Sequence, residues 1–318
     1  MIPAILREAR RPLCIGIGGG GDVVGALATA EHCRTEYGAR PVLGGVTWER
    51  RPIDPQPGPR AAAEIEDARP AGAGAEPAVL FANARTRVGG SGVRFAESRM
   101  AELLGQETVL VDVNHGPAAI AEGLGAASAE LGCDLVVFVD VGGDVLAHGG
   151  EPGLASPLCD AVMLAAAVRM AGGGGPGVLG AVFGIGCDGE LTPDEVLARL
   201  GEVEQAGGLL GRLPIEERVA RRLEEAVRAV PTEASALALR AFRGESGRVE
   251  IRGGRRHVDL RPLAAATVFF DPAVATRSAA RLAEAVHDAP DLGAANEVLH
   301  VLGVRTELDY ELDAAKAV

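Results

Sequence analysis

The chain has 318 residues, of which 47% are hydrophobic, 24% are charged and only 3% are aromatic, and its formal net charge is -13. That length is sufficient for one large α/β domain or two ordinary ones with an ample core. The acidic balance argues against nucleic acid as a partner, because nucleic-acid binding requires a basic face, and against anionic membrane surfaces. The expected partner is a small molecule, and a homo-oligomer is compatible with this composition.

Apolar runs rich in Val and Ile alternate with longer segments rich in Ala, Leu, Glu and Arg, as in βα repeats around a parallel sheet. In chain order we expect strands at 13–18, 41–47, 78–82, 108–113, 134–140, 178–185 and 266–270. Helices are expected at 23–36, 96–104, 117–131, 157–171, 193–206, 215–229, 232–243, 273–287 and 292–302. We therefore predict a three-layer α/β fold with a Rossmann-like, mostly parallel sheet, in which residues 1–318 form one domain with a helical insertion at 207–247.

Three other segments have a distinctive pattern. Residues 51–77 are rich in Pro, Ala and Gly, which fits either a mobile linker or a binding loop beside a site. The stretch RVEIRGGRRHVDL predicts an exposed hairpin with a two-residue turn at Gly253-Gly254. AGGGGPG at 171–177 is interpreted as an ordinary connection from a helix to a strand.

Several classes of protein are excluded by what the chain lacks. No stretch approaches 18 uninterrupted apolar residues and the N-terminus has no signal-peptide pattern, so a cytoplasmic protein without a transmembrane helix is expected. The five cysteines are scattered without CxxC spacing, which argues against a disulfide framework and a thiolate zinc site. Lys316 is the only lysine, so a Walker-type phosphate loop and, unless the tail folds back, Schiff-base chemistry are excluded.

Acidic and other polar residues follow almost every expected strand. In an open α/β sheet the ligand lies beyond the carboxyl ends of the strands, so residues at these positions are candidates for a site. Some of them will instead be helix caps or turn formers, for which Asp is common. The residues are Asp22, Trp48, Glu49, Arg50, Asn114, His115, Asp140, Asp144, His148, Glu151, Asp188, Glu190 and Asp271.

The stretch CIGIGGGGDVVGAL places Gly16-x-Gly18-x-x-Gly21 between a strand and a helix. Such glycines let backbone amides at a helix N-terminus approach a phosphate or carboxylate, which predicts an anion site at Gly18, Gly19, Gly20 and Gly21. Asp22 would repel that anion unless it binds a metal or acts as an acid or base; the alternative is a simple helix cap. As a dinucleotide motif the stretch is incomplete, because Glu49 comes later than the usual spacing for a ribose contact.

The stretch DVGGDVLAHGGEPGLASPLCDAV combines acidic residues with two Gly-Gly pairs. A loop of this kind can curl so that Asp140, Asp144 and Glu151 converge on Mg²⁺ or Mn²⁺, which prefer oxygen ligands. The alternative is a solvated acidic loop whose glycines form turns, and Asp160 is expected in the first turn of its helix. Asp22, Asp140 and His148 are the expected catalytic residues.

Arginines and one tryptophan supply candidate substrate contacts. Arg50 and Arg60 follow the second expected strand, and Arg94 follows another glycine-rich turn. Arginine binds carboxylates or phosphates with two parallel hydrogen bonds, so these three are predicted to hold the anion. Trp48 could stack on a planar ring or belong to the core. Asn114 and His115 are expected to contact the substrate.

Four stretches of the chain resemble a known family. GIGGGGDVVGAL, GGVTWERRPIDPQPGPR, VDVGGDVLAHGGEPGLASPLCDAV and GVRTELDYE are similar to domain-of-unknown-function family 1152, which is found mainly in archaea and actinobacteria. The resemblance covers most of the chain. It implies no activity and no assigned site residues.

Together these patterns favour an enzyme that acts on a small anionic metabolite, phosphorylated or nucleotide-like. Metal-assisted group transfer, hydrolysis, cyclisation or ligation with Mg²⁺ or Mn²⁺ would fit. One alternative is an NAD(P)-dependent oxidoreductase that holds the pyrophosphate of its cofactor on the glycine-rich loop. Another is a nucleotide-binding sensor without catalysis.

Overall fold

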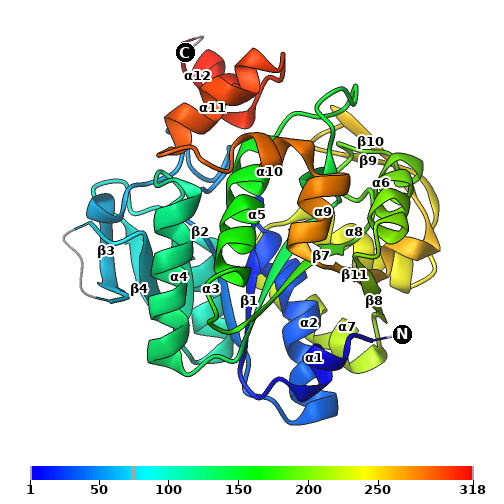
Figure 1. Cartoon of the computed structure of the whole chain (residues 1–318), viewed down its shortest axis with the longest axis horizontal. Coiled ribbons are helices and arrows are strands. Elements are labelled where there is room, and N and C mark those ends of the chain that lie inside the picture. Colours follow the sequence, from blue (N-terminus) through cyan, green and yellow to red (C-terminus); the bar gives the residue numbers. More distant parts are fainter. Residues whose placement is uncertain (1, 73–75, 317–318) are drawn as a thin grey trace.

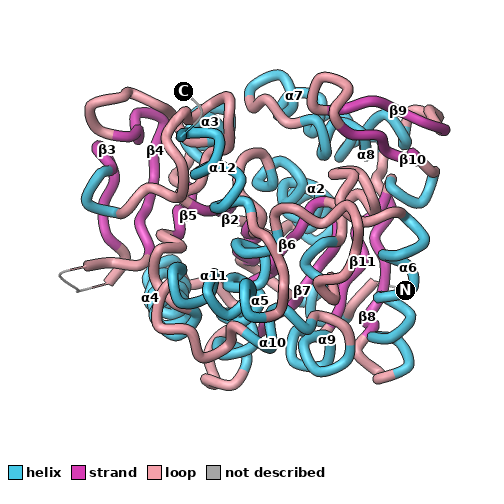
Figure 2. Tube along the Cα trace, turned by 90° about the horizontal axis from the view of Figure 1, so that it is seen from above, coloured by secondary structure: helices cyan, strands magenta, loops and turns pink. Residues whose placement is uncertain are grey.

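A twisted sheet runs through the centre of the molecule (Figures 1 and 2). The structure is a computed structural model that describes residues 2–72 and 76–316. Within this part of the chain the sheet has nine strands in the order β3-β4-β5-β2-β1-β6-β7-β11-β8. Its five central strands are parallel and buried, or nearly so, which explains their continuous apolar sequences. They are β5 (Thr108–Val111), β2 (Val42–Val46), β1 (Pro12–Gly16), β6 (Leu135–Val141) and β7 (Gly177–Phe183).

Antiparallel strands extend the sheet at both edges. On one side β4 (Val79–Val88) pairs with β5, and β3 (Ile65–Pro70) pairs with β4. On the other side β11 (Ala266–Phe270) pairs with β7, and β8 (Leu209–Pro214) pairs with β11. The sheet is therefore mostly parallel, with mixed edges.

Helices cover both faces of the sheet and complete three layers (Figure 2). Strand side chains alternate between the faces, so Val137 of β6 packs into one core and Phe138 into the other. The Val137 face is covered by α2 (Asp22–Tyr37), α3 (Ala96–Leu104), α7 (Glu217–Ala229) and α8 (Glu233–Phe242), with α1 (Ala4–Glu8) at its margin. The Phe138 face is covered by α4 (Pro117–Leu131), α5 (Pro157–Ala171), α6 (Pro193–Gln205), α9 (Pro272–Ser278), α10 (Arg281–Ala285) and α11 (Leu292–Val301). This is the three-layer, Rossmann-like α/β fold that the sequence predicts.

Two elements lie above the carboxyl ends of the parallel strands (Figures 1 and 2). One is the C-terminal helix α12 (Glu307–Lys316). The other is the antiparallel hairpin of β9 (Gly247–Ile251) and β10 (Arg256–Leu260). Ile251 pairs with Arg256, so the hairpin has a four-residue loop instead of the expected two-residue turn. No helix in the described ranges is long and apolar enough to cross a membrane.

The sequence-based expectations fail mainly at the edges of the sheet. The segment 207–247, predicted as a helical insertion, contains the two expected helices as α7 and α8 but begins with the edge strand β8, which was not expected. Part of 51–77, expected to be irregular, is strand β3, and residues 73–75 of that segment lie outside the described residues. Both strands are largely exposed; β3 is mainly polar, and in β8 a glycine and an arginine interrupt the leucines, so neither has the continuous apolar run of a buried strand. The expected helix 273–287 is broken into α9 and α10, and α12 was not expected.

The direction of β11 changes the position of one predicted site residue. Because β11 is antiparallel to β7, its carboxyl end lies at the opposite edge of the sheet from the ends of the parallel strands. Asp271 follows that end, where its carboxylate accepts a hydrogen bond from Val274 N at 2.9 Å and caps α9. The prediction that Asp271 joins the other strand-end acids is therefore wrong.

Candidate functional site

The order in which strands are added to the sheet changes side at β1, so β1 and β6 flank the switch point of the sheet. Strand β2 lies on one side of β1, whereas β6 and then β7 lie on the other. The loops that leave β1 and β6 therefore separate, and a crevice is expected between them in folds of this type. The glycine-rich loop and the Asp140–Asp144 segment are the loops at this position.

The glycine-rich loop makes a tight turn into α2. Gly19 and Gly20 have φ angles of 87° and 58°, which glycine adopts without strain. Gly18 N donates to a carboxylate oxygen of Asp22 at 3.0 Å, and Gly20 N donates to the carbonyl of Trp48 at 2.9 Å. Two amides of the expected anion cradle are thus engaged within the protein, and one of them fixes the carboxylate of Asp22.

Acidic side chains converge at this crevice from loops after three strands and from the first turn of α5. Asp140 of β6 lies on the same side of the strand as Phe138, which is the face covered by α5. It therefore meets Asp160 of α5, and Asp22 reaches them from the start of α2. We call the whole group the acidic centre: Asp22, Asp140, Asp144, Asp160, Asp188 and Glu190.

Within the acidic centre, two groups of three carboxylates adjoin. One oxygen from each of Asp22, Asp140 and Asp160 lies within 4.8 Å of the others. Asp144 forms a second such group with Asp188 and Glu190, and it also interacts electrostatically with Asp22 and Asp160. The structure thus brings together Asp22, Asp140 and Asp144, and adds carboxylates that were not assigned to the metal site from the sequence.

The residues of the acidic centre are buried except for Asp22, which is partly exposed, and their carboxylates are only partly hydrogen-bonded. Asp160 and Asp188 are 2% and 6% exposed. One oxygen of Asp160 and both oxygens of Asp188 have no hydrogen-bond partner among the described residues. Buried charges without partners are strongly unfavourable, so such carboxylates are stable only when they are protonated or when a cation compensates their charge.

Burial also raises the pKa values of these carboxyl groups, because removal from water disfavours their charged form. Removal from water raises the pKa of Asp22 to about 7, although the Gly18 amide and Arg50 oppose the shift. Burial and the neighbouring Glu190 raise the pKa of Asp188 to about 7. Burial and the surrounding carboxylates also raise the pKa of Asp140, Asp144 and Asp160 well above the usual range of an aspartate.

Two glycines leave the space that the carboxylates fill. A Cβ atom on Gly18 would lie 2.7 Å from a carboxylate oxygen of Asp22 and 3.0 Å from one of Asp160. A Cβ atom on Gly142 would lie 2.3 Å from an oxygen of Asp188, at a φ of 131° that other residues rarely adopt. The glycines therefore allow the backbone to approach carboxylates rather than only an external anion.

On one side of the acidic centre, α12 forms a closed network with Arg50. The guanidinium of Arg50 donates to Gly18 O at 2.6 Å and to Glu307 at 3.2 Å. Glu307 in turn accepts hydrogen bonds from Leu158 N and Cys159 N at 3.0 and 2.9 Å, at the N-terminus of α5. The carboxylate of Glu307 therefore occupies a position where a helix N-terminus would favour an external anion.

The indole of Trp48 belongs to the same network. Its ring lies 4.1 Å beneath the guanidinium of Arg50, and its Nε1 donates to Glu311 at 3.0 Å. The ring is fully buried. Trp48 therefore stacks on Arg50 and is covered, so it does not offer an open face to a planar ligand.

Other predicted contacts lie away from the acidic centre and are paired within the protein. Glu151 accepts hydrogen bonds from His148 N and Gly149 N, whereas the His148 ring pairs with Glu202 at 2.9 Å. Neither Glu151 nor His148 belongs to the two groups of acids described above. The guanidinium of Arg60 forms an ion pair with the carboxylate of Asp54 at 2.7 Å, and the guanidinium of Arg94 forms one with Glu102 at 2.7 Å.

The remaining predicted residues also have structural partners. The carboxylate of Glu49 accepts a hydrogen bond from Ala96 N at the start of α3 and is buried, so it does not present an open carboxylate to a ribose. Asn114 donates to Asp112 at 2.9 Å, and His115 lies 3.9 Å from the same carboxylate. This pair follows β5, which is two strands away from β1.

The family described as "Protein of unknown function (DUF1152)" matches residues 13–315 of the chain. The chain belongs to this family. No curated protein matches the sequence of this DUF1152 member. The family description carries no activity, so any functional argument depends on the geometry of the site.

Residues that sequence reasoning did not assign lie on both sides of the acidic centre. Glu307 and Glu311 come from the end of the chain, and no local pattern connects them with the glycine-rich loop. Arg252 and Arg256 of the hairpin lie 3.6 and 3.3 Å from Glu190. The only signal for the hairpin was its density of arginines in an acidic chain.

Proposed function

We propose that this DUF1152 protein is a metal-dependent enzyme that binds Mg²⁺ or Mn²⁺ in the acidic centre and acts on a small anionic metabolite by group transfer or hydrolysis. The observation that carries the proposal is the set of buried carboxylate oxygens of Asp160 and Asp188 without hydrogen-bond partners among the described residues. A divalent cation would compensate their charge and account for the cost of burying them.

The donor set favours a hard cation. The three carboxylates of Asp22, Asp140 and Asp160 offer oxygen only, and within the described residues no histidine or cysteine joins either group of acids. Oxygen ligands suit Mg²⁺ and Mn²⁺, whereas zinc and copper sites usually include nitrogen or sulfur. Three protein ligands would leave coordination positions for water and substrate, as in other Mg²⁺ sites.

The second group of acids suits a different role. Glu190 already accepts hydrogen bonds from Ala155 N, Ser156 N and the Ser156 hydroxyl, and two arginines lie beside it. It is therefore a poor ligand for a second cation. Asp188 has two unpartnered oxygens within the described part of the chain and adjoins the first group, so we assign it the role of general base toward a water or hydroxyl nucleophile.

A bound divalent cation would polarise an oxygen of the substrate and favour deprotonation of a coordinated water. The residues of the chain would contribute orientation and exclusion of water. Gly18 N fixes Asp22, Val145 N approaches Asp140 at 3.4 Å, and α5 positions Asp160. Under this proposal Asp140 keeps the predicted metal-binding role, and Asp22 takes metal binding, which the sequence left open, in place of acid–base catalysis.

The decisive experiment is Mn²⁺ binding to the full chain, measured by titration calorimetry and by the loss of the free Mn²⁺ electron paramagnetic resonance signal. Asp160→Asn should weaken Mn²⁺ binding by about 100-fold or more, since even changes around a ligand typically cost 10- to 100-fold. Asp271→Asn is the matched control, because this aspartate caps a helix at the opposite edge of the sheet and asparagine also caps well.

The thermal stability of the metal-free Asp160→Asn variant shows whether a loss of Mn²⁺ binding comes from loss of a ligand or from loss of folding. In the metal-free protein, Asp160→Asn removes one of several crowded buried carboxylates and should increase thermal stability. Wild-type protein that binds no Mn²⁺ at millimolar concentration would contradict the proposal, as would Asp160→Asn protein that binds it normally. Mn²⁺ binding without turnover of phosphorylated or nucleotide-like compounds would favour a sensor.

A further inference from the structure

A basic hairpin faces the acidic centre from the side opposite α12. In a chain with a net charge of -13, the segment 247–260 carries four arginines and one histidine. Ile251, Val258 and Leu260 anchor it in the core on the α2 side of the sheet. The backbone of Arg252, with a φ of 53°, is further held by a hydrogen bond from its N to Glu233 at 2.8 Å. The hairpin is therefore a fixed part of the fold that displays positive charge.

Two of these arginines are directed at the acidic centre without being saturated by it. Arg252 and Arg256 reach only one oxygen of Glu190, at 3.6 and 3.3 Å, distances that are long for a charge-assisted hydrogen bond. Nη1 of Arg256 is buried and has no hydrogen-bond partner among the residues described. Arg252 also acts electrostatically on Asp22 and Asp188. Two guanidinium groups thus lie at the rim of the proposed metal site with donors left over.

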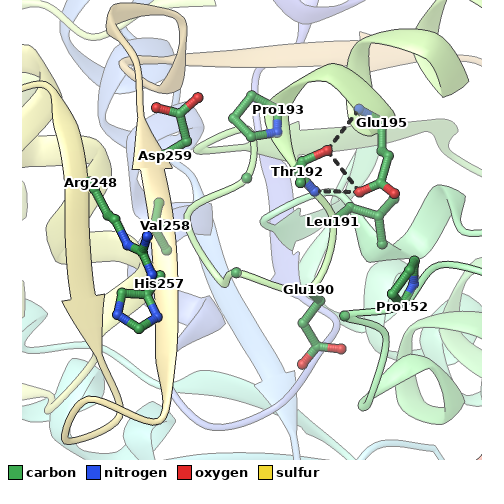
Figure 3. A pocket seen from close by; sticks show the side chains of 13 residues that line it. Pro152, Glu190, Leu191, Thr192, Pro193, Glu195, Arg248, His257, Val258 and Asp259 are labelled. Atoms are coloured by element: carbon green, nitrogen blue, oxygen red, sulfur yellow. Dashed lines mark hydrogen bonds between the residues drawn. The ribbon is translucent and has the colours of Figure 1, made fainter.

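A pocket of about 450 Å³ lies between the hairpin and the loop that contains Glu190 (Figure 3). The hairpin forms one wall with Arg248, His257 and Val258, and the loop from β7 to α6 forms the other. Glu190 belongs to both the pocket lining and the acidic centre, and its side chain is fully buried, so the pocket adjoins the acidic centre at this residue. Prolines, Leu191 and glycines supply much of the remaining lining, which suits the less polar part of a ligand.

From these observations we infer that the hairpin is the substrate's phosphate-binding element: Arg252 and Arg256 bind a phosphate or pyrophosphate group that also contacts the metal ion, and the adjacent pocket takes the organic part of the substrate. The inference rests on the proposed metal centre and names the substrate class of that site. Arginine donates two parallel hydrogen bonds to phosphate oxygens, and a metal-bound anion would neutralise the excess positive charge of the pair.

This assignment replaces the arginines expected from the sequence. Arg60 and Arg94 are paired elsewhere, and Arg50 is already bonded to Gly18 O and Glu307. Nη1 of Arg50 also lacks a hydrogen-bond partner among the described residues, but Arg50 does not line the pocket, whereas the hairpin lines it and carries Arg252 and Arg256 beside Glu190.

The test separates anion binding from metal binding. Protein saturated with Mn²⁺ is titrated calorimetrically with inorganic phosphate, inorganic pyrophosphate and, as a carboxylate probe, oxalate, with heats of metal complexation measured without protein. Each of Arg252→Gln and Arg256→Gln should weaken pyrophosphate binding roughly 10- to 100-fold. Arg255→Gln is the matched control, because its side chain donates to Arg252 O instead of facing Glu190; it should change binding less than twofold.

In the absence of phosphate, the same two substitutions should not weaken Mn²⁺ binding. Removing positive charge beside the carboxylates should leave Mn²⁺ binding equal or tighter in Arg252→Gln and Arg256→Gln. Normal Mn²⁺ binding with unchanged pyrophosphate affinity in both variants would overturn the inference and leave the metal proposal standing. Parallel loss of Mn²⁺ and pyrophosphate binding would assign the arginines a structural role, and oxalate binding as tight as that of pyrophosphate would overturn the substrate class. Absence of Mn²⁺ binding in wild-type protein would instead refute the proposed function.

Discussion

The α12 side and the hairpin side of the acidic centre differ in how completely their charges are paired. On the α12 side, Glu307 is bonded to Arg50 and to two backbone amides, and Glu311 is bonded to Trp48 and to Gly58 N. On the hairpin side, Arg252 and Arg256 share one carboxylate oxygen at longer distances, and other residues of the hairpin line a pocket. The two carboxylates of the α12 side are fully engaged, although Nη1 of Arg50 has no hydrogen-bond partner among the described residues, whereas the arginines of the hairpin side make only long contacts.

The comparison shows that a charged residue just after a strand is not necessarily a ligand-binding residue. Arg50 follows a central strand and meets every sequence criterion for an anion clamp, yet the chain supplies its own carboxylate to it. Arg252 and Arg256 follow no strand of the main sheet, yet they face the centre with donors available. We therefore expect the α12 side to determine stability and the hairpin side to determine ligand binding.

The largest expected effect on stability comes from breaking the ion pair on the α12 side. Glu307→Gln leaves Arg50 without its main buried partner, and loss of one member of a buried ion pair typically costs about 3–5 kcal/mol. Urea unfolding of the full chain measures this change. Asp313→Asn on the same helix removes exposed pairs with Arg305 and Lys316 and should cost less than about 1 kcal/mol. Equal effects of the two substitutions would contradict the idea that the α12 side determines stability.

The pH dependence of metal-free protein tests the crowding of the acidic centre itself. The pKa of Asp22 is raised from 3.8 to about 7, and that of Asp188 likewise, so the folded state binds protons more tightly than the unfolded state. These groups therefore favour folding at low pH, and the contribution is lost as the pH rises from about 4 through about 7. Protein treated with a chelator should lose at least about 1 kcal/mol of unfolding free energy over this range.

Excess Mg²⁺ should reduce this loss at pH 7.5, because a ligand that binds only the folded state stabilises it. Mg²⁺ should stabilise the Asp160→Asn variant much less than the wild-type protein at this pH. Metal-free protein whose stability rises between pH 5 and pH 7 in the wild type would show that the carboxylates are not crowded as described.

A smaller effect is expected from the indole hydrogen bond. Trp48→Phe keeps an aromatic ring beneath Arg50 but removes the donor to Glu311, which should cost about 1 kcal/mol. Pyrophosphate and Mn²⁺ binding should remain within twofold of the wild type. A large loss of pyrophosphate binding with unchanged stability would place the ligand on the α12 side instead of the hairpin side.

The sequence predicts the central part of the fold well. Helices α3, α4 and α5 have the expected ranges, because their apolar faces and the proline and glycine residues at their ends are local signals. The convergence of Asp22, Asp140 and Asp144 also follows from local reasoning, since each directly follows or ends a parallel strand. Burial on both faces makes such strands continuous apolar runs that are easy to recognise.

The rest of the site depends on contacts between distant parts of the chain. Asp160 has the pattern of a dipole-favoured residue in the first helical turn, and only packing of α5 against β6 brings it to Asp140. Glu307 reaches Leu158 across 149 positions of sequence. Asp271 was misplaced because strand direction cannot be read from a short apolar run. The partners of the arginines are likewise decided by tertiary structure.

The most direct measurement is the anomalous difference map from crystals soaked in Mn²⁺. The account predicts one strong peak coordinated by carboxylate oxygens of Asp22, Asp140 and Asp160, and no such peak in crystals of Asp160→Asn. A Mn²⁺ peak located elsewhere, with the three carboxylates protonated or bonded to one another, would contradict it.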